Sequence, residues 1–363
     1  MDREYSAVQT APDPVQPSAY LHDYREKRKR AVWVALGFLA VLIAVVCISF
    51  LLGRYPVTPD TVVRMLWYKL WGLSGDWTTV EETVVLNIRL PRILAAVAVG
   101  SALSVSGAAY QGIFKNPMVS PDILGASAGA SVGAALALLL GWSTAMVQAS
   151  AFVLGIGAVA LAYTLSRSIG RGNNMVLLLV LCGMVVSTLF QAGVSIIKYL
   201  ADPDSTLPEI TYWLMGSISK VGYNDLAYFL IPYLIGVIPL LLLRWKLNVL
   251  SFGDEEAKAL GVNTEQTRVI CIVCATLLTA ATVSISGTVG WVGLMIPHLV
   301  RFLVGPNYKA VLPLSLLGGA AFMLIVDNFC RCMLAYEIPL GILTSIIGGP
   351  FFVLILYQRK GEA

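Results

Sequence analysis

The sequence offers few residues with which to carry out catalysis. It holds only two histidines, His22 and His298, and its six cysteines all fall in or at the ends of apolar segments. Cys271 and Cys274 form a CxxC pair, but cysteines inside an apolar helix usually act as small apolar side chains. No G-x-x-x-x-G-K-[ST] phosphate-binding loop occurs. We therefore predict that the chain is not an enzyme and has no catalytic residues, metal site or cofactor of its own.

The charged and small residues that begin at Arg89 are more informative. Arg89 and Arg92 stand three residues apart at the start of an apolar segment. Beyond an Asn-Pro turn, Gly125, Gly129 and Gly133 recur at a spacing of four, which places them on one helix face. Small residues at this spacing let two helix backbones approach closely, as helices do inside a lipid bilayer. The pattern predicts tightly packed membrane helices.

The elements that carry these residues are predicted to be membrane spans. Hydrophobic residues make up 57% of the chain, charged residues only 13%, and the mean hydropathy is +0.77. These values lie outside the usual range of soluble proteins. A helix crosses the hydrocarbon core with roughly 20 apolar residues, so we predict an all-α polytopic membrane protein with about ten spans in one transmembrane domain, residues 31–358. The predicted spans lie near 31–53, 93–113, 122–140, 144–166, 175–199, 226–243, 269–288, 290–304, 311–334 and 339–357.

The distribution of Lys and Arg predicts how the chain crosses the membrane. With the N-terminus inside, 17 of the 25 Lys and Arg residues fall in inner segments, most densely at 25–30. Because positive residues are enriched in cytoplasmic loops, we place both termini in the cytoplasm, in a plasma (inner) membrane. Residues 1–30 lack apolar periodicity and are predicted to form a disordered cytoplasmic tail. The net charge of +4 then reflects topology and gives no reason to expect nucleic-acid binding.

An internal repeat relates two parts of the chain. Residues 104–107 (SVSG) match residues 284–287 (SISG) at an offset of 180, and the same offset aligns a proline and a glycine further along. Under the predicted topology the two copies cross the membrane in opposite directions, as inverted repeats of transporters do. The predicted halves are about 93–199 and 269–357.

The predicted spans carry few groups that could bind a coupling ion. Secondary transporters usually hold carboxylates or histidines inside the membrane, whereas four spans here hold no ionisable side chain except tyrosine or cysteine. With no phosphate-binding loop either, the chain is predicted to take its energy from a partner protein. A secondary transporter that binds sodium through backbone carbonyls is one alternative, and a structural or sensory membrane subunit is another.

The long inner segment 244–268 offers a docking site for such a partner. Three successive acidic residues from Asp254 suit the N-terminal end of a short helix, and Gly261 follows its end. Ala257, Ala259 and Leu260 would leave a small apolar surface for a groove on another protein. On physical grounds alone, an ordinary surface helix is an equally good interpretation.

Six motifs spread along the chain resemble the FecCD family, the permease subunits of ABC importers for iron chelates, haem and vitamin B12. They follow one another in order between about residues 32 and 357. The motifs are RLPR at 89–92, NP at 116–117 followed by Pro121 and LG at 124–125, WLMGS at 213–217, GDEEAKALG at 253–261, GLMIPH at 293–298 and EIPLG at 337–341.

The resemblance implies a ten-helix subunit that pairs with a second copy of itself, with the pathway between the copies. It also implies two cytoplasmic ABC ATPase subunits, which hold ATP and Mg, and an extracytoplasmic substrate-binding protein. The segment 253–261 is similar to the family's coupling helix. The residues it assigns to coupling are Gly253, Asp254, Glu255, Glu256, Ala257, Leu260 and Gly261.

In the family, arginines of the RLPR motif and one near the outer end of the ninth span pair with acidic residues of the binding protein. The resemblance therefore implies that Arg89, Arg92 and Arg331 dock that protein. The spacing from Arg331 to Glu337 is one residue shorter than the usual pattern. The alternative for Arg89 and Arg92 is that they reach from a helix end to the membrane interface.

The fifth predicted span carries a polar stripe formed by Ser187, Gln191 and Ser195, and the fifth helix of the family lines its conduit. Hydrogen bonding between helices is the alternative role of this stripe. A conduit lined with so few charged side chains suits a large chelate that is bound only weakly while it crosses the membrane. The family favours an iron chelate (siderophore or haem) as cargo, followed by cobalamin and then an oxyanion such as molybdate.

Overall fold

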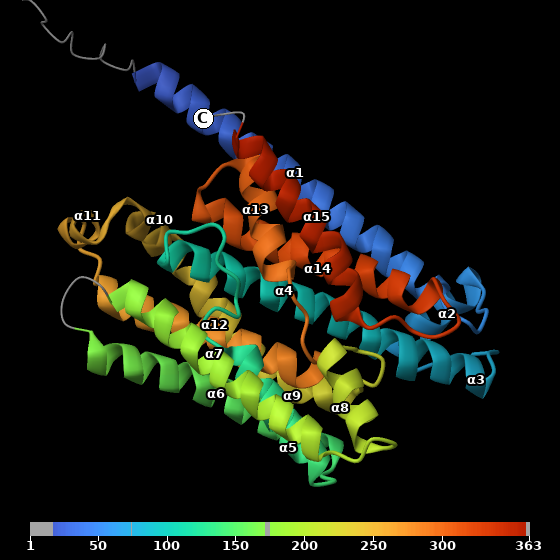
Figure 1. The fold of residues 1–363 in the computed structure, drawn as a ribbon. Helices are drawn as coiled ribbons and strands as arrows, with labels where there is room; N and C mark the ends of the chain where they lie inside the picture. The colour runs from blue at the N-terminus through green and yellow to red at the C-terminus, as the bar shows by residue number, and fades with distance from the viewer. Residues whose placement is uncertain (1–16, 74, 171–174, 361–363) are drawn as a thin grey trace, which may run out of the picture.

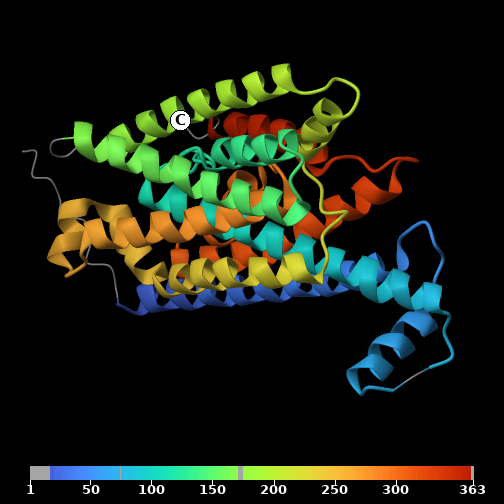
Figure 2. The same cartoon turned by 90° about the horizontal axis from the view of Figure 1, so that it is seen from below.

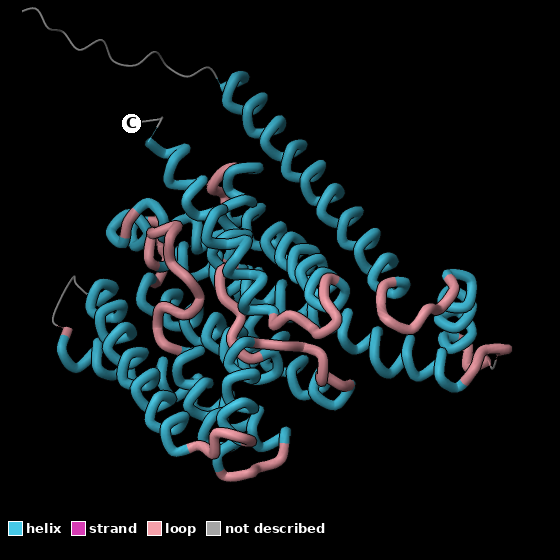
Figure 3. The backbone as a smooth tube through the Cα atoms, turned by 45° about the vertical axis from the view of Figure 1, so that its right-hand side comes forward, coloured by secondary structure: helices cyan, strands magenta, loops and turns pink. Residues whose placement is uncertain are grey.

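The computed structural model describes residues 17–73, 75–170 and 175–360, and within these ranges it consists of helices and loops without strands (Figures 1 and 3). The all-α prediction is therefore confirmed. The elements are α1 (Pro17–Leu51), α2 (Pro59–Leu70), α3 (Thr79–Glu82), the π-helix η1 (Thr83–Arg89), α4 (Leu90–Ile113), α5 (Ala126–Leu139), α6 (Thr144–Ile169), α7 (Met175–Leu200), α8 (Thr206–Met215), α9 (Tyr223–Leu242), α10 (Arg244–Phe252), α11 (Asp254–Ala259), α12 (Thr264–Ser286), α13 (Val292–Val304), α14 (Tyr308–Cys332) and α15 (Leu340–Lys360).

Apolar helices occupy all the predicted spans. Among the described residues, seven helical stretches are long and apolar enough to cross a membrane: α1, the continuous rod α3–η1–α4, α6, α7, α9, α12 and α14. Three shorter apolar helices, α5, α13 and α15, take the remaining places. The predicted pair 269–288 and 290–304 corresponds to α12 and α13, which a short loop separates. The chain is thus polytopic, with a span count close to the predicted ten.

The first helix begins earlier than expected. α1 starts at Pro17, so residues 17–30 are helical and the prediction of a disordered tail is wrong for them. Proline is favoured at a first helical position. The residues after it extend a helix that the apolar span has already nucleated, so they avoid the unfavourable first turn. Residues 1–16 lie outside the described residues.

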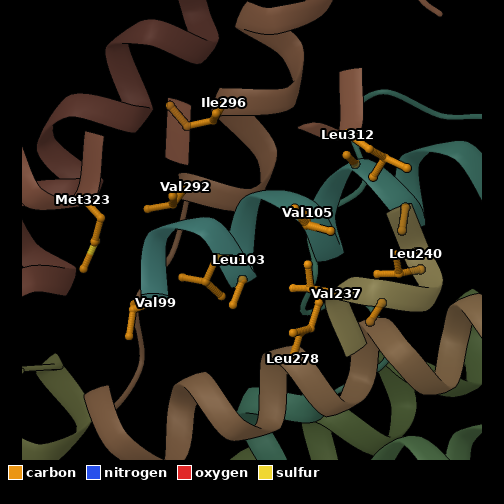
Figure 4. Packing of buried hydrophobic residues seen from close by; sticks show 14 of the residues in the cluster. Val99, Leu103, Val105, Val237, Leu240, Leu278, Val292, Ile296, Leu312 and Met323 are labelled. Carbon is orange, nitrogen blue, oxygen red and sulfur yellow. The ribbon is translucent and has the colours of Figure 1, made fainter. Parts of the chain in front are cut away.

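The centre of the bundle is α4, which packs against α9, α12, α13 and α14. Most of its residues are buried, so its apolar side chains contact other helices and not lipid. Figure 4 shows Val99, Leu103 and Val105 of α4 among side chains of these four neighbours. The neighbouring side chains labelled there are Val237 and Leu240 from α9, Leu278 from α12, Val292 and Ile296 from α13, and Leu312 and Met323 from α14.

Glycines set how closely α4 meets its neighbours. A Cβ atom added to Gly107 would lie 1.8 Å from the carbonyl oxygen of Gly293 in α13. One added to Gly100 would lie 2.1 Å from the carbonyl oxygen of Gly319 in α14. In a membrane, where lipid is as apolar as the helix faces, such close backbone contact supplies much of the association energy.

The two ends of the bundle carry different short elements. α10 and α11 lie at one end, called here the α11 end, while α2, α3 and α8 lie toward the other, called the α8 end (Figure 1). α1 runs along one side of the bundle, and α6 and α7 run along the opposite side (Figure 2). The residues singled out in the sequence fall at these two ends and on α5 and α7.

Candidate functional site

The RLPR motif lies where η1 passes into α4. The rod begins with a capping box at Thr78, which fixes its first turn. The rod then continues as the π-helix η1, which ends two residues before Pro91. Proline has no N–H to donate to the preceding turn. Arg89 is 3% exposed and Arg92 7% exposed, so both arginines lie inside the protein.

Arg92 is held between two carboxylates at the α8 end. Its Nε lies 3.0 and 3.1 Å from the two carboxylate oxygens of Asp327, and its Nη2 lies 2.9 Å from Oδ1 of the same residue. Its Nη1 lies 2.8 and 3.0 Å from the carboxylate oxygens of Glu337. Asp327, on α14, is fully buried, whereas Glu337 lies in the α14–α15 loop. Arg92 thereby links α4, α14 and that loop through charge-assisted hydrogen bonds.

The other two arginines are also paired within the chain. Arg89 donates to two backbone carbonyls near the connection between α1 and α2. Arg331 donates to the carbonyl oxygen of Ser49 over 2.8 Å and to the side chain of Asn328, and its Nε lies 3.9 Å from a carboxylate oxygen of Asp327. The three arginines, Asp327 and Glu337 form one group, called here the arginine cluster.

The structure therefore brings the three predicted docking arginines to one end but leaves none of them free. Each is buried. Arg89 and Arg92 therefore do not reach from a helix end to the membrane interface, which was the alternative to docking. Their docking role stays a prediction. The sequence analysis did not identify Asp327 and Glu337 as partners of Arg92. Two signals pointed to them: Asp327 lies one helical turn before Arg331, and Glu337 is the first residue of the EIPLG motif.

At the other end, α11 forms where the sequence predicted a short helix. It follows Gly253, at φ +151°, and Gly261, at φ +78°, lies just beyond its end. Backbone conformations of this kind favour glycine and stop the flanking helices. Glu255 and Glu256 are exposed on α11, as solvated acidic side chains at a helix N-terminus are expected to be.

The apolar surface beside α11 differs from the prediction. Ala257 is fully buried within this chain, so the expectation that it forms an exposed contact is wrong. Its side chain faces the protein because α11 packs back on α10 and α12. Leu260 is 59% exposed, as expected, and Phe252, at the end of α10, is 74% exposed. The exposure of Phe252 was not predicted, because a single apolar residue before a glycine forms no recognisable sequence pattern.

Asp254 fastens α11 to the bundle. Its carboxylate lies 2.9 Å from Nη2 of Arg268 on α12 and 3.5 Å from Nζ of Lys115, in the turn after α4. Burial acts to raise the pKa of Asp254, but the hydrogen bonds and charge of Arg268 and the charge of Lys115 outweigh it and hold that pKa below its usual range. The carboxylate therefore stays ionised at neutral pH, and the link weakens only in acid.

The polar stripe on α7 makes its hydrogen bonds within its own helix. The Ser187 hydroxyl donates to the carbonyl oxygen of Gly183 over 2.8 Å, and the Ser195 hydroxyl donates to that of Gln191 over 3.1 Å. Gln191 and Ser195 are exposed. These bonds argue against the alternative in which the serines join helices, while a place along a pathway stays a prediction.

The three spaced glycines serve two different contacts. A Cβ atom on Gly129 would lie 2.3 Å from the carbonyl oxygen of Leu154, and one on Gly133 would lie 2.4 Å from that of Ser150, both in α6. Gly125 instead precedes α5 at φ +87° and faces α7. Two glycines therefore lie where α5 meets α6, and the third allows the turn into α5.

The predicted repeat has different local structure in its two copies. Residues 104–107 lie inside α4, while residues 284–287 lie at the end of α12. α12 starts at the α11 end and α4 starts at the α8 end, so the copies run in opposite directions (Figure 1). The relation between the halves stays a prediction.

Cysteines and histidines gather at no metal site in the part of the chain that the structure describes. No group of three or more His, Cys, Asp and Glu side chains there could hold a metal ion. Cys271 and Cys274 are buried free thiols in α12, where they fill space between helices.

The comparison with known families decides between an ABC importer permease, a secondary transporter and a structural or sensory membrane subunit. The family described as the FecCD transport family matches residues 41–358. The chain belongs to the FecCD transport family. The resemblance read from the six motifs is thus confirmed, and the chain is an ABC importer permease of the FecCD type.

Two relatives show how far the similarity of this FecCD permease extends. It is 41% identical over 327 residues to the molybdate import system permease protein MolB of Haemophilus influenzae, covering 90% of this chain and 96% of MolB. It is 36% identical over 334 residues to the hemin transport system permease protein HmuU of Yersinia pestis, covering 90% and 96%. Both relatives match along nearly the whole chain.

A solved structure agrees with the fold of this FecCD permease. A metal-chelate type ABC transporter in an inward-facing conformation matches with a TM-score of 0.80 and 39% identity, over 90% of this chain and 99% of that chain. Together with the apolar helices, the family places the chain in the plasma membrane as a multi-pass protein.

Proposed function

We propose that two copies of this chain form the translocation pathway of an importer driven by two cytoplasmic ABC ATPase subunits. The observation that carries the proposal is α11, a short polar helix flanked by the exposed side chains of Phe252 and Leu260 and tied to two spans through Asp254. A partner that grips this surface would move α12 and the turn after α4 with it. The sequence has no phosphate-binding loop, so ATP and Mg²⁺ belong to the partner.

The opposite end is proposed to receive an extracytoplasmic substrate-binding protein. In this orientation α11 and both termini are cytoplasmic, in accord with the distribution of Lys and Arg. The arginine cluster then lies at the outer end of the bundle and holds one more positive than negative charge. An excess positive charge beside exposed loops favours a partner with acidic side chains.

For the cargo, we propose an iron chelate, either a siderophore complex or haem. The hemin permease that is 36% identical and the metal-chelate transporter that is 39% identical support this choice. Molybdate is a second candidate because the molybdate permease MolB is 41% identical over 90% of the chain. Cobalamin, a third member of the cargo range implied by the motifs, follows these two.

Uptake by the reconstituted complex distinguishes the cargoes. The tagged chain is purified with the ATPase and binding protein that accompany it, inserted into liposomes, and offered a ferric siderophore, haem, cobalamin and molybdate in separate labelled assays. ATP-dependent uptake of an iron chelate is expected. Uptake of molybdate alone would move the assignment to the second candidate, and uptake of none would contradict the iron-chelate proposal.

A further inference from the structure

The two carboxylates that hold Arg92 are not equivalent. Asp327 lies on α14 with none of its side chain exposed and engages both Nε and Nη2 of Arg92. Glu337 lies in a loop, keeps 31% of its side chain exposed and engages only Nη1. Removing Asp327 from the pair would leave a buried charge without a partner, whereas Glu337 can move into water. Glu337 is therefore the replaceable partner.

We propose that Glu337 occupies the position on Arg92 that an acidic side chain of the docking binding protein takes, so that Glu337 competes with docking. This inference rests on the proposed docking role of the arginine cluster. The occupant is an Asp or Glu side chain, because the group that fits Nη1 now is a carboxylate and a guanidinium edge matches carboxylate geometry. The competitor and the partner then share one hydrogen-bonding edge.

The loop around Glu337 allows this exchange without unfolding. Its neighbour Tyr336 is 86% exposed, so no part of the chain that the structure describes covers the loop there. A backbone hydrogen bond of 3.0 Å from Ile338 to Cys330 and the Arg54 guanidinium on a loop carbonyl hold the loop on both sides of the carboxylate. The Glu337 side chain can turn away while these anchors keep the backbone in place.

The charge balance of the arginine cluster favours an incoming carboxylate once Glu337 leaves. With Glu337 in place, the arginine cluster holds three guanidinium groups and two carboxylates, and Arg92 contacts both carboxylates. Without the Glu337 charge only Asp327 remains negative, and the excess positive charge of the cluster rises from one to two. An acidic partner side chain is then attracted more strongly, so a variant that lacks the Glu337 charge should dock more tightly.

The test measures how tightly the binding protein that co-purifies with the tagged chain attaches to the permease–ATPase complex in lipid nanodiscs. Glu337→Gln is expected to lower the dissociation constant by roughly three- to tenfold, the worth of about one hydrogen bond. Glu337→Asp keeps the charge and should stay near the wild-type value. An unchanged or weaker attachment of Glu337→Gln, with Glu337→Asp like wild type, overturns the proposal.

Two controls separate competition from other effects. Glu209→Gln removes an exposed carboxylate of α8 that has no contact with the arginine cluster, so it should give little gain. An equal gain from Glu209→Gln would show that only net charge matters, and would overturn the proposal. Arg92→Lys should abolish the gain from Glu337→Gln, because a single ammonium group cannot replace the fork. If Arg92→Lys and Arg89→Lys both leave docking unchanged, the docking role itself is wrong.

Discussion

At the scale of single residues, the decisive feature is a pair of opposite charges shut away from water. Asp327 has no exposed side-chain surface, and Arg92 is almost as deeply buried. Such a pair is stable only while both members are present, because the remaining charge would lie unpaired in a poorly polarisable interior. Their bonds hold the start of α4 against the end of α14.

Replacing Asp327 with Ala is expected to lower the free energy of unfolding by about 3–5 kcal/mol, the range for breaking a buried ion pair. The matched control is Asp60→Ala, which removes an exposed carboxylate 2.6 Å from Arg64. Exposed pairs contribute little, so the control should melt near the wild-type temperature. Thermal melting of the purified protein in one detergent compares the two. Equal melting temperatures for both variants would contradict the structural role of Asp327.

The sequence singled out the arginines but not their partners. Arg89 and Arg92 belong to a local motif, which a reader of the sequence can find. Asp327 and Glu337 lie more than two hundred residues further along, and only the packing of α14 on α4 brings them to Arg92. Contacts between distant segments leave no mark in local spacing, so the burial of the arginines could not be predicted.

At the scale of elements, α11 shows what local patterns can and cannot predict. Its acidic start and its glycine end are local signals, and the helix forms between them. Which of its apolar residues faces outward depends on α10 and α12, so Leu260 was predicted correctly and Ala257 was not. The start of α1 was missed for a related reason, because residues 17–30 continue a helix that they would not begin alone.

Leu260→Glu is expected to abolish ATP-driven uptake while leaving the protein in the membrane in normal amount. The side chain is 59% exposed, so the folded chain tolerates the charge, but a partner groove would bury it unpaired. Leu260→Met keeps an apolar side chain of similar size and should transport normally. Wild-type coupling of uptake to ATP hydrolysis in Leu260→Glu would show that the ATPase docks elsewhere.

Close helix contacts give a second test at this scale. Gly107→Ala should destabilise the protein by about 1–3 kcal/mol, because the added methyl group meets the backbone of Gly293 and the helices must separate. Gly157→Ala on α6 makes the same chemical change with no atom within 4 Å, so it should be neutral or slightly stabilising. Melting temperatures measured side by side decide the point, and equal losses would contradict the packing of α4 on α13.

At the scale of the whole molecule, the sequence predicted a helical bundle with many membrane spans but not the arrangement of those spans. All spans are apolar, so composition does not reveal that α4 lies at the centre while α1 lies at the edge. α7 exposes large apolar side chains such as Leu189, Ile196 and Tyr199. In a membrane these can face lipid or a second copy of the chain, which the proposed homodimer supplies.

The measurement that tests the account most directly is uptake into liposomes by the chain alone and by the complete complex. The account predicts no uptake and no ATP hydrolysis by the purified chain alone, with or without a sodium or proton gradient. It predicts uptake when the ATPase, the binding protein and ATP are all present, and loss of uptake when any one is withheld. Gradient-driven uptake by the chain alone, or ATP hydrolysis without a partner, would contradict it.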